Sequence, residues 1–329
     1  MSLSEFNLIE RYFVGRGPRR SDVALGIGDD CALLRVPAGM ELAISIDALV
    51  AGVHFPEHTS AEAIGYKALA VGLSDLAAMG AEPAWASLAL SLPQADEAWL
   101  QAFSAGLFGL AQRFNVQLVG GDTVRGPLVI SLQLHGLVPQ GQALRRSGAR
   151  VGDLVYVTGT PGDAGIGLEL ALGKRTVTPE FGAYLRDRLD RPTPRITAGV
   201  SLRGIASAAI DISDGLAADL GHILESSDVG ARIDLVRLPQ SAALQAVEPD
   251  ATRRFRYALG SGDDYELCFT VPPTAQKTAE QLCADLDCGC RCIGVIEEQP
   301  GLRLVAADGA LLSPDHLGFD HFAAAGAEQ

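Results

Sequence analysis

Aspartate residues beside glycines or at strand ends recur in five separate places along the chain. In open α/β sheets, ligands gather at the carboxyl ends of the strands, so these are places where chemistry is expected. Asp75 adds a carboxylate inside an alanine-rich helix, where a charge is costly unless it has a partner. The five places are Gly28-Asp29-Asp30, Ile46-Asp47, Gly121-Asp122, Asp211-Ile212-Ser213-Asp214-Gly215 and Gly262-Asp263-Asp264.

Taken singly, each Asp-Gly or Gly-Asp pair is ordinary turn chemistry, and that is the favoured interpretation of any one of them. Taken together, five acidic loops would repel one another and could meet stably only around cations. Carboxylate oxygens favour magnesium or calcium over softer metals, and the twelve-residue spacing of a calcium loop is absent. Magnesium commonly bridges protein carboxylates to substrate phosphates, so the pattern indicates nucleotide-dependent phosphoryl transfer.

The common nucleotide-binding motifs are missing from the sequence. The glycine–lysine pair is followed by Arg175 where a P-loop has Ser or Thr, and no kinase-type H-R-D loop occurs. The turn at residues 159–165 could cradle an anion at a helix N-terminus, although a structural turn is favoured. The pair Arg145 and Arg146 could supply positive charge for phosphate or could be a solvated linker.

Composition argues against several classes of protein. The 329 residues include 26 basic and 40 acidic side chains, so phosphate neutralisation of a nucleic acid is not expected. Mean hydropathy is +0.19, yet no apolar run reaches the length of a membrane span. The N-terminus lacks the apolar stretch of a signal peptide, so we expect a cytoplasmic protein without membrane contact. The six cysteines are expected as free thiols, and buried thiols are favoured over a metal site at Cys288, Cys290 and Cys292.

Apolar periodicity predicts alternating strands and helices in both halves of the chain. A polar stretch at 140–152 is the expected boundary, which gives an N-terminal domain at 1–139 and a C-terminal domain at 150–329. In the first half we expect helices at 4–13, 61–79 and 96–114, and strands at 25–36, 41–46, 84–92, 116–119 and 128–138. In the second half we expect strands at 154–158, 208–212, 265–271, 290–296 and 302–306, and helices after 165, at 196–207 and at 216–226.

Nine motifs, which follow one another across nearly the whole chain, resemble those of bacterial thiamine-monophosphate kinases. SDLAAMGA and GGDT are shared with the wider superfamily of aminoimidazole-ribonucleotide synthetase and selenophosphate synthetase, whereas DALVAGVHF and GFDHF are more specific to the thiamine enzymes. The motifs are GIGDDCALL (26–34), SIDALVAGVHF (45–55), YKALAVGLSDLAAMGAEP (66–83), LVGGDTVRGP (118–127), RSGA (146–149), VTGTPGDAG (157–165), DISDGLAADLGHI (211–223), GDDYELCFT (262–270) and GFDHF (318–322).

This resemblance implies ATP-dependent phosphorylation of thiamine monophosphate to thiamine diphosphate, by direct in-line transfer at a multi-magnesium aspartate cluster. It implies an α+β N-terminal domain that binds ATP and magnesium, with a mixed sheet that pairs with its copy in a homodimer. It also implies an α/β C-terminal domain, like that of aminoimidazole-ribonucleotide synthetase, which completes the active-site cleft. ATP, thiamine monophosphate and several Mg²⁺ ions are the expected partners.

The resemblance also assigns roles to the residues that match the family's motifs. No acid or base residue is implied, because the attacking phosphate oxygen is already ionised at neutral pH. The implied metal ligands are Asp30, Ser45, Ile46 through its backbone, Asp47, Asp75, Asp122, Asp211 and Asp214; the ATP contacts are Gly121, Asp122, Arg146 and Ser213; the substrate contacts are His54, Asp263 and Phe319.

Three positions depart from the family pattern. Ile46 stands where many members carry Thr, so a metal ligand there can come only from the backbone. Asp263 stands where many carry Glu and reaches one methylene less far. Ala105 lies where some members place an aromatic residue thought to touch adenine, and we assign it no role. Outside their motifs, His54 would be interpreted as a hydrogen-bonded strand-end histidine and Phe319 as core packing.

Two other functions are compatible with the sequence. A related synthetase of the same superfamily would use ATP to activate an amide oxygen or selenide, and Cys31 beside Asp30 fits such chemistry. A non-catalytic magnesium–nucleotide-binding module would bind ATP without releasing ADP. Release of ADP in the presence of each candidate acceptor separates these functions from the kinase.

Overall fold

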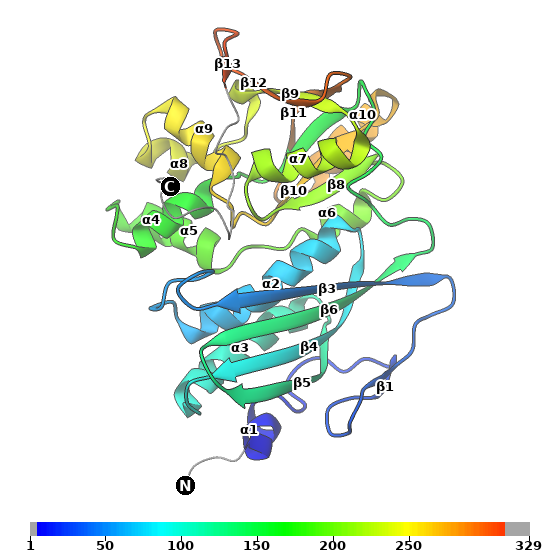
Figure 1. The fold of residues 1–329 in the computed structure, drawn as a ribbon, viewed down its shortest axis with the longest axis vertical. Helices are drawn as coiled ribbons and strands as arrows, with labels where there is room; N and C mark the ends of the chain where they lie inside the picture. Colours follow the sequence, from blue (N-terminus) through cyan, green and yellow to red (C-terminus); the bar gives the residue numbers. More distant parts are fainter. Residues whose placement is uncertain (1–4, 313–329) are drawn as a thin grey trace. The chain divides into compact units, whose positions relative to one another are not determined.

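The chain forms two compact units in the computed structural model, which describes residues 5–312 (Figure 1). The first unit is built from the residues up to Ala143 together with Asp190–Arg203, and the second from Leu144–Leu189 with the residues from Gly204 onward. The division after Ala143 lies inside the expected boundary region. The return of Asp190–Arg203 to the first unit is a tertiary feature that no local sequence pattern predicts.

A four-stranded sheet with the order β3–β6–β4–β5 forms the centre of the first unit (Figure 1). β6 pairs antiparallel with both β3 and β4, whereas β5 pairs parallel with β4. Buried and half-buried side chains alternate along most of β6, so one face of the sheet carries the apolar core. The strands are β3 (Met40–Val50), β4 (Glu82–Leu92), β5 (Gln117–Arg125) and β6 (Val129–Pro139).

Helices α2 (Ala61–Ala78) and α3 (Glu97–Arg113) cover one face of this sheet (Figure 1). Each begins at a side-chain cap, because the Ser60 hydroxyl and the Asp96 carboxylate accept backbone N–H groups of the first turn. The two helices touch backbone to backbone: a Cβ atom on Gly65 would lie 2.0 Å from the carbonyl oxygen of Phe103. The core between these helices and the sheet therefore depends on glycine at the helix crossing.

Two strands extend beyond the ends that the sequence predicts, and this changes the position of two aspartates. Both β3 and β5 continue for several residues, so Asp47 and Asp122 lie within strands rather than at their ends. Neighbouring strands supply hydrogen-bond partners along this extra length, with Asp47 opposite Leu132 of β6 and Asp122 opposite Ala89 of β4. The interpretation of these two aspartates as strand-end turn residues is wrong.

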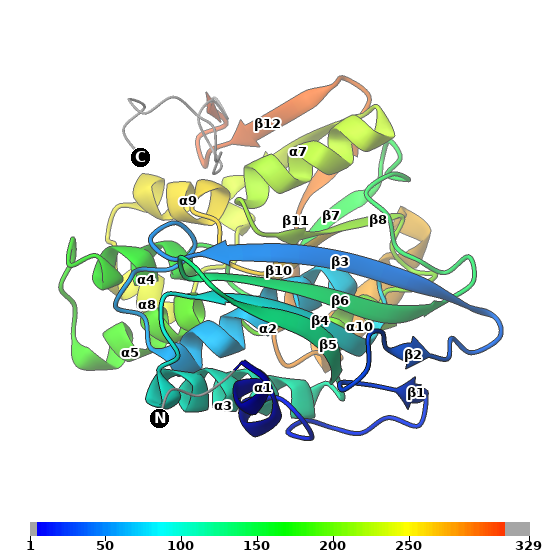
Figure 2. The same ribbon diagram turned by 60° about the horizontal axis from the view of Figure 1, so that its bottom comes forward.

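The strand-like segment expected at 25–36, with a break at Gly28-Asp29-Asp30, is a short hairpin of β1 (Val23–Leu25) and β2 (Leu33–Leu34). Side chains of this hairpin pack against buried Trp85 near the beginning of β4. In Figure 2 the hairpin lies beside the beginnings of β4 and β5. Two further helices complete the described part of the first unit: α1 (Glu5–Tyr12) and α6 (Ile196–Ser201).

Helix α6 is shorter than the helix expected at 196–207. It ends before Gly204, which has a φ of 71° and so cannot continue a right-handed helix. α6 packs closely on α2, because a Cβ atom on Gly199 would lie 1.9 Å from the Ala77 carbonyl oxygen. This contact holds the returning segment in the first unit.

The second unit contains a seven-stranded mixed sheet with the order β13–β12–β9–β11–β7–β10–β8. Every residue of β8 and β10 is buried, which indicates that both faces of the sheet are covered there. The strands are β7 (Leu154–Thr158), β8 (Ala208–Ile212), β9 (Gly230–Asp234), β10 (Glu266–Val271), β11 (Cys290–Glu297), β12 (Gly301–Val305) and β13 (Leu311–Leu312).

One edge of this sheet gathers the segments that carry most of the second half's motifs. Thr158 at the end of β7 pairs with Cys290 at the beginning of β11, and Ile212 at the end of β8 pairs with Glu266 at the beginning of β10. The loops after β7 and β8 and before β10 and β11 therefore share this edge. We call it the loop edge.

Several helices of the second unit lie where the sequence analysis expects no element. They contain only 6 to 12 residues, which is too short for a pattern of two or three turns to stand out in the sequence. α4 and α7 are the expected helices, and α5, α8, α9 and α10 are the unexpected ones. The helical segments are α4 (Asp163–Ala171), α5 (Pro179–Asp190), α7 (Leu216–Ser227), η1 (Leu235–Arg237), α8 (Ala242–Val247), α9 (Ala251–Gly260), η2 (Pro273–Ala275) and α10 (Gln276–Asp285).

A disulfide joins Cys283 of α10 to Cys290 of β11, with 5.0 Å between their Cα atoms. The expectation that all six cysteines are free thiols is therefore wrong for this pair. The alternation of cysteines at the start of β11 gives no hint of it, because the partner comes from the preceding helix. Within residues 5–312, no helix has the length and apolar character needed to cross a membrane.

Candidate active site

Two acidic side chains of the first unit meet between β3 and α2. Ser45 and Asp47 are two residues apart on β3, so both point to the sheet face that α2 covers. The Ser45 hydroxyl donates a hydrogen bond to Asp75 of α2. Asp47 packs against α2 at Gly72, where an added Cβ atom would lie 3.3 Å from the Asp47 Oδ2 atom. The predicted ligands Ser45, Asp47 and Asp75 thus form one group, which we call the β3–α2 site.

The electrostatics of the β3–α2 site are unfavourable for two ionised carboxylates. Burial and the neighbouring Asp75 raise the pKa of Asp47 to about 7. The Asp47 Oδ2 atom is buried, and within residues 5–312 no N–H group or hydroxyl donates a hydrogen bond to it. A buried carboxylate oxygen without a donor is costly, and a cation would remove that cost. The oxygen-only donor set suits a hard divalent cation such as Mg²⁺.

His54 follows the end of β3 and lies away from the β3–α2 site. Its Nδ1 atom accepts the Val50 N–H at 3.0 Å, which places the ring proton on Nε2. The buried Lys67 ammonium donates to the His54 carbonyl at 3.4 Å. Lys67 and Asp75 are separated by about 12 Å along α2, at 1.5 Å per residue. His54 is thus held in one orientation at some distance from the β3–α2 site.

The remaining predicted ligands of the first unit lie elsewhere. Asp122 lies opposite Ala89 of β4, which lies opposite Ser131 of β6, which in turn lies opposite Ala48 of β3. Residues in one such row share a face of the sheet, and Asp47, which is next to Ala48, points to the other face. Its side chain is exposed, like that of Asp30 in the β1–β2 loop. Ile46 is 67 % exposed on the same outer face as Asp122. Within a single copy of the chain, the Asp122 side chain therefore does not reach the β3–α2 site.

Gly121, which precedes Asp122, is required by the packing of β5. Its φ is 147°, and a Cβ atom there would lie 1.8 Å from the Leu88 carbonyl oxygen. Any larger residue would push β5 away from β4. The glycine thus fixes the position of the Asp122 backbone, whatever ligand that segment binds.

In the second unit, the loop after β8 and the loop before β10 are joined by hydrogen bonds at the loop edge. The Asp263 N–H donates to the Ser213 carbonyl at 2.8 Å, and the Tyr265 hydroxyl donates to the Asp263 carboxylate at 3.1 Å. Asp263 and Tyr265 have φ values of 60° and 50°, which are strained for residues with side chains. Two predicted contacts, Ser213 to ATP and Asp263 to the substrate, thus lie side by side.

Asp219 is a residue of this region that the sequence analysis missed. One of its carboxylate oxygens accepts the N–H groups of Ser213, Asp214 and Gly215 at 3.0, 3.1 and 3.1 Å. Burial and the nearby Asp214 raise the pKa of Asp219 to about 7, although the three N–H donors act in the opposite direction. An aspartate in the first turn of α7, within the DISDGLAADL motif, was the available signal.

The other predicted residues of the second unit are more widely placed. Asp211 is buried within β8, and Asp214 is half-buried in the loop that follows. Arg146 lies near the beginning of β8, because the neighbouring Arg145 carbonyl accepts the Ala209 N–H. Ser213 follows the other end of that strand, about 13 Å away at 3.3 Å per residue. The backbone positions of Arg146 and Ser213 are therefore separated by the length of β8.

A buried acidic network beneath the loop edge also escaped the sequence analysis. The Asp163 carboxylate accepts hydroxyl groups from Thr160, Tyr184 and Ser241 at 2.7, 2.9 and 2.6 Å. Asp264 is buried and accepts the Gly162 N–H, and burial raises its pKa well above the usual value. These bonds engage the Asp163 carboxylate and the Gly162 N–H, as expected for a structural turn after β7.

Across residues 5–312, no three His, Cys, Asp or Glu side chains are grouped closely enough to hold a metal ion among themselves. The structure brings Asp47 to Asp75 in the first unit and Asp263 to Ser213 in the second. Phe319 lies outside the described residues. The wider convergence of six aspartates stays a prediction.

Family models match both halves of the chain. The model described as AIR synthase related protein, N-terminal domain, matches residues 28–138, and the corresponding C-terminal domain matches residues 150–307. These matches, together with the two mixed sheets, define a protein of the AIR synthase-related class.

Comparison with individual proteins assigns the chain to one family within this class. Thiamine-monophosphate kinase of Escherichia coli K12 is 52 % identical over 326 residues, which cover 98 % of this chain and 99 % of that protein. The Bacillus subtilis protein of the same name is 35 % identical over 330 residues, covering 97 % of this chain and all of that protein. The chain belongs to the thiamine-monophosphate kinase family, and it is a kinase.

Solved structures agree with this assignment. Thiamine-monophosphate kinase from Stenotrophomonas maltophilia aligns with a TM-score of 0.86 and 47 % identity, over 95 % of this chain and 99 % of that one. AaThiL complexed with AMPPCP and TMP aligns with a TM-score of 0.76 and 33 % identity, over 87 % and 89 %. Hydrogenase maturation protein HypE has a TM-score of 0.76 at 20 % identity, which shows a shared fold alone.

Proposed function

We propose that this chain transfers the γ-phosphoryl group of ATP to thiamine monophosphate and forms thiamine diphosphate. Support comes from its membership of the kinase family and from a relative whose structure was solved with AMPPCP and TMP. The acceptor is a phosphate oxygen that is already ionised at neutral pH. The chain therefore needs no base to activate the acceptor, and its task is to hold two polyanions together in line.

The observation that carries the metal part of this proposal is the β3–α2 site. Asp47 and Asp75 place two carboxylates in one buried position, and the Asp47 Oδ2 atom lacks a donor. We propose that these two residues, with Ser45 beside them, bind Mg²⁺. When bound, Mg²⁺ would neutralise charge on the phosphates during transfer.

Residues of the second unit would position the substrates through a rigid loop. Ser213 and Asp263 are joined through their backbones, and Asp219 binds three successive N–H groups of the same loop. We propose that Asp219 is a positioning residue, which keeps Ser213 and Asp214 in the conformation that contacts ATP and metal. The left-handed conformations of this region are maintained by these bonds rather than by ligand.

We further propose that the outer face of the first unit's sheet pairs with a second copy of the chain. Leu42, Ile44 and Ile46 of β3 and Val124 of β5 expose 40, 55, 67 and 51 % of their surface. Large apolar side chains so exposed on one sheet face are typical of an interaction surface. Asp122 lies on the same face, so its proposed contacts with metal and ATP would form within the dimer.

The decisive experiment is an assay of the purified chain with Mg–ATP and thiamine monophosphate, in which thiamine diphosphate is measured by chromatography. We expect stoichiometric formation of thiamine diphosphate and ADP. Asp75→Asn should lower turnover by two or more orders of magnitude, because it removes a ligand charge beside the reacting phosphates. Asp96→Asn is the matched control, since Asp96 only caps α3. Absence of thiamine diphosphate with the unmodified chain would overturn the kinase proposal, and near-normal turnover in Asp75→Asn would remove the metal role.

A further inference from the structure

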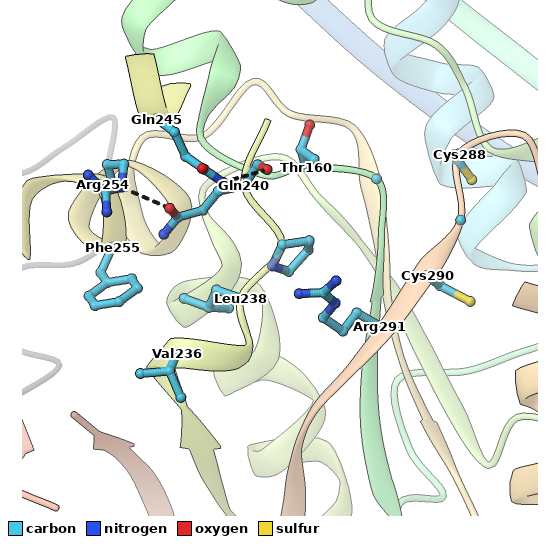
Figure 3. Close-up of a pocket in the computed structure, with 13 residues that line it drawn as sticks. Thr160, Val236, Leu238, Gln240, Gln245, Arg254, Phe255, Cys288, Cys290 and Arg291 are labelled. Carbon is cyan, nitrogen blue, oxygen red and sulfur yellow. Dashed lines mark hydrogen bonds between the residues drawn. The ribbon is translucent and has the colours of Figure 1, made fainter. Parts of the chain in front are cut away.

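A cavity of about 570 Å³ lies in the second unit, beside the loop edge (Figure 3). Its walls come from the turn after β7, the segment after η1, helices α8 and α9, and the beginning of β11. None of the described residues that line it is a predicted metal, ATP or substrate contact. We call it the β7–β11 cavity, and the functions discussed above do not use it.

The lining of the β7–β11 cavity is cationic in a chain whose net charge is −14. Arg254 and Arg291 both line it, whereas none of the described lining residues is Asp or Glu. Arg291 is exposed, and its guanidinium makes no hydrogen bond or ion pair with another residue in the described part of the chain. In Figure 3 this guanidinium lies within the group of lining residues. An uncompensated guanidinium in a concave wall concentrates anions and favours phosphate.

The surroundings hold the backbone at Arg291 and the side chain of Arg254. Arg291 directly follows Cys290, whose disulfide to Cys283 ties the beginning of β11 to α10. Arg254 donates to the Gln240 side chain at 2.8 Å and to the Glu248 carbonyl at 2.7 Å. These acceptors are neutral, and the Asp250 carboxylate at the beginning of α9 offsets part of the Arg254 charge. The Arg254 side chain is already ordered and loses little entropy when a ligand binds, whereas the Arg291 side chain becomes ordered on binding.

Two apolar side chains line the cavity, and in Figure 3 Leu238 lies between the two arginines while Phe255 lies beside Arg254. Leu238 comes from the segment after η1, and Phe255 comes from α9. The Phe255 ring is only partly buried and packs on the core of the second unit. The cavity therefore combines an anion-binding end with a wall on which a ring or an apolar group can rest.

We propose that the β7–β11 cavity binds a small molecule that carries a phosphate or diphosphate ester on Arg291 and a ring against Leu238 and Phe255. Two sources share this chemistry: the thiamine phosphates and the adenine nucleotides. The cavity adjoins the turn after β7, whose Gly162 N–H donates to Asp264 beside Asp263. The turn after β7 thus connects the cavity to the loop that carries Asp263. A ligand bound in the cavity would change the position or mobility of that loop.

Binding is measured on the purified full chain without Mg²⁺, by calorimetry with pyrophosphate, thiamine diphosphate, ADP and unphosphorylated thiamine. We expect thiamine diphosphate or ADP to bind more tightly than pyrophosphate, and thiamine not to bind. Arg291→Gln should weaken binding by about 10-fold or more, as expected for loss of a charge-assisted contact. Arg256→Gln is the matched control, because Arg256 is exposed on α9 and does not line the cavity.

Hydrogen exchange then locates the ligand. Protection is expected in peptides that contain the segment after η1 and the beginning of β11, and it should be lost in Arg291→Gln. The kinase assay separates this inference from the proposed function: Arg291→Gln should keep its KM for thiamine monophosphate and its turnover. Three results would each overturn the inference: equal binding in Arg291→Gln and the unmodified chain, no binding of any phosphorylated probe, or an increase in KM that parallels the loss of binding.

Discussion

Replacement of Asp47 by Asn should stabilise the metal-free protein while it abolishes turnover. Burial and the neighbouring Asp75 raise the pKa of Asp47 from 3.8 to about 7, which corresponds to about 4 kcal/mol against the ionised group. Because the folded chain binds this proton more tightly than the unfolded chain does, ionisation destabilises the fold progressively between pH 3.8 and about 7. Asn has nearly the same shape and carries no charge, so it removes this cost.

The assay is urea unfolding in EDTA followed by tryptophan fluorescence. Both tryptophans, Trp85 and Trp99, belong to the first unit, so the signal reports on the unit that holds Asp47. At pH 8 the gain in Asp47→Asn should approach about 4 kcal/mol, and at pH 5 it should be less than half of that. Mg²⁺ should then stabilise the unmodified chain more than the variant.

Asp122→Asn is the matched control for this prediction. Asp122 is also a proposed ligand, so its replacement should lower turnover, but its exposed carboxylate has no comparable burial cost. Its effect on stability should be small and similar at both pH values. A gain in Asp47→Asn that is equal at pH 5 and pH 8, or a loss at pH 8, would show that burial of the Asp47 charge is not the dominant effect.

Gly65→Ala should destabilise the first unit by about 2 kcal/mol or more, because its Cβ atom would lie 2.0 Å from the Phe103 carbonyl oxygen; unchanged urea unfolding would contradict this packing. Ile44→Lys should convert the proposed dimer to monomer in sedimentation equilibrium, since it places a charge on the exposed outer face; a dimer that persists would exclude this face. Asp22→Asn should cost about 1–2 kcal/mol at pH 7. Burial alone would raise the pKa of Asp22, but hydrogen bonds from a neighbouring arginine and Trp85 outweigh it and lower the pKa. The contribution of Asp22 is therefore present at neutral pH and lost as pH falls through its lowered pKa, so the cost should shrink in acid unfolding curves.

The local sequence predicts the helices and strands that have strong apolar periodicity or a capping residue. α2 and α3 begin beside Ser60 and Asp96, whose caps are visible in the sequence. α8 and α9 contain only six and ten residues, and the sequence analysis did not find them although Ser241 and Asp250 cap them. The extra length of β3 and β5 depends on partner strands that lie far away in the sequence, so strand ends were placed too early.

The grouping of site residues was predictable only in part. The resemblance of the motifs implies that Asp47 and Asp75 act together, and the structure places them next to each other across β3 and α2. Asp122 was expected in the same group, but the register of β4 with β5 turns it to the opposite face of the sheet. Asp219 escaped notice because its role is to bind backbone N–H groups, which leaves no signature in residue type.

The order of its motifs alone determines the family of this chain, its kinase chemistry and the identity of its conspicuous acidic residues. Sequence also determines the strong net negative charge that makes a cationic cavity unusual here. Only tertiary structure decides which acids share a space, that Cys283 pairs with Cys290, and that Arg291 lines a cavity with Phe255. The physical reason is that motif chemistry is carried by neighbouring residues, whereas burial, charge coupling and cavities arise from strand register and helix packing between distant ones.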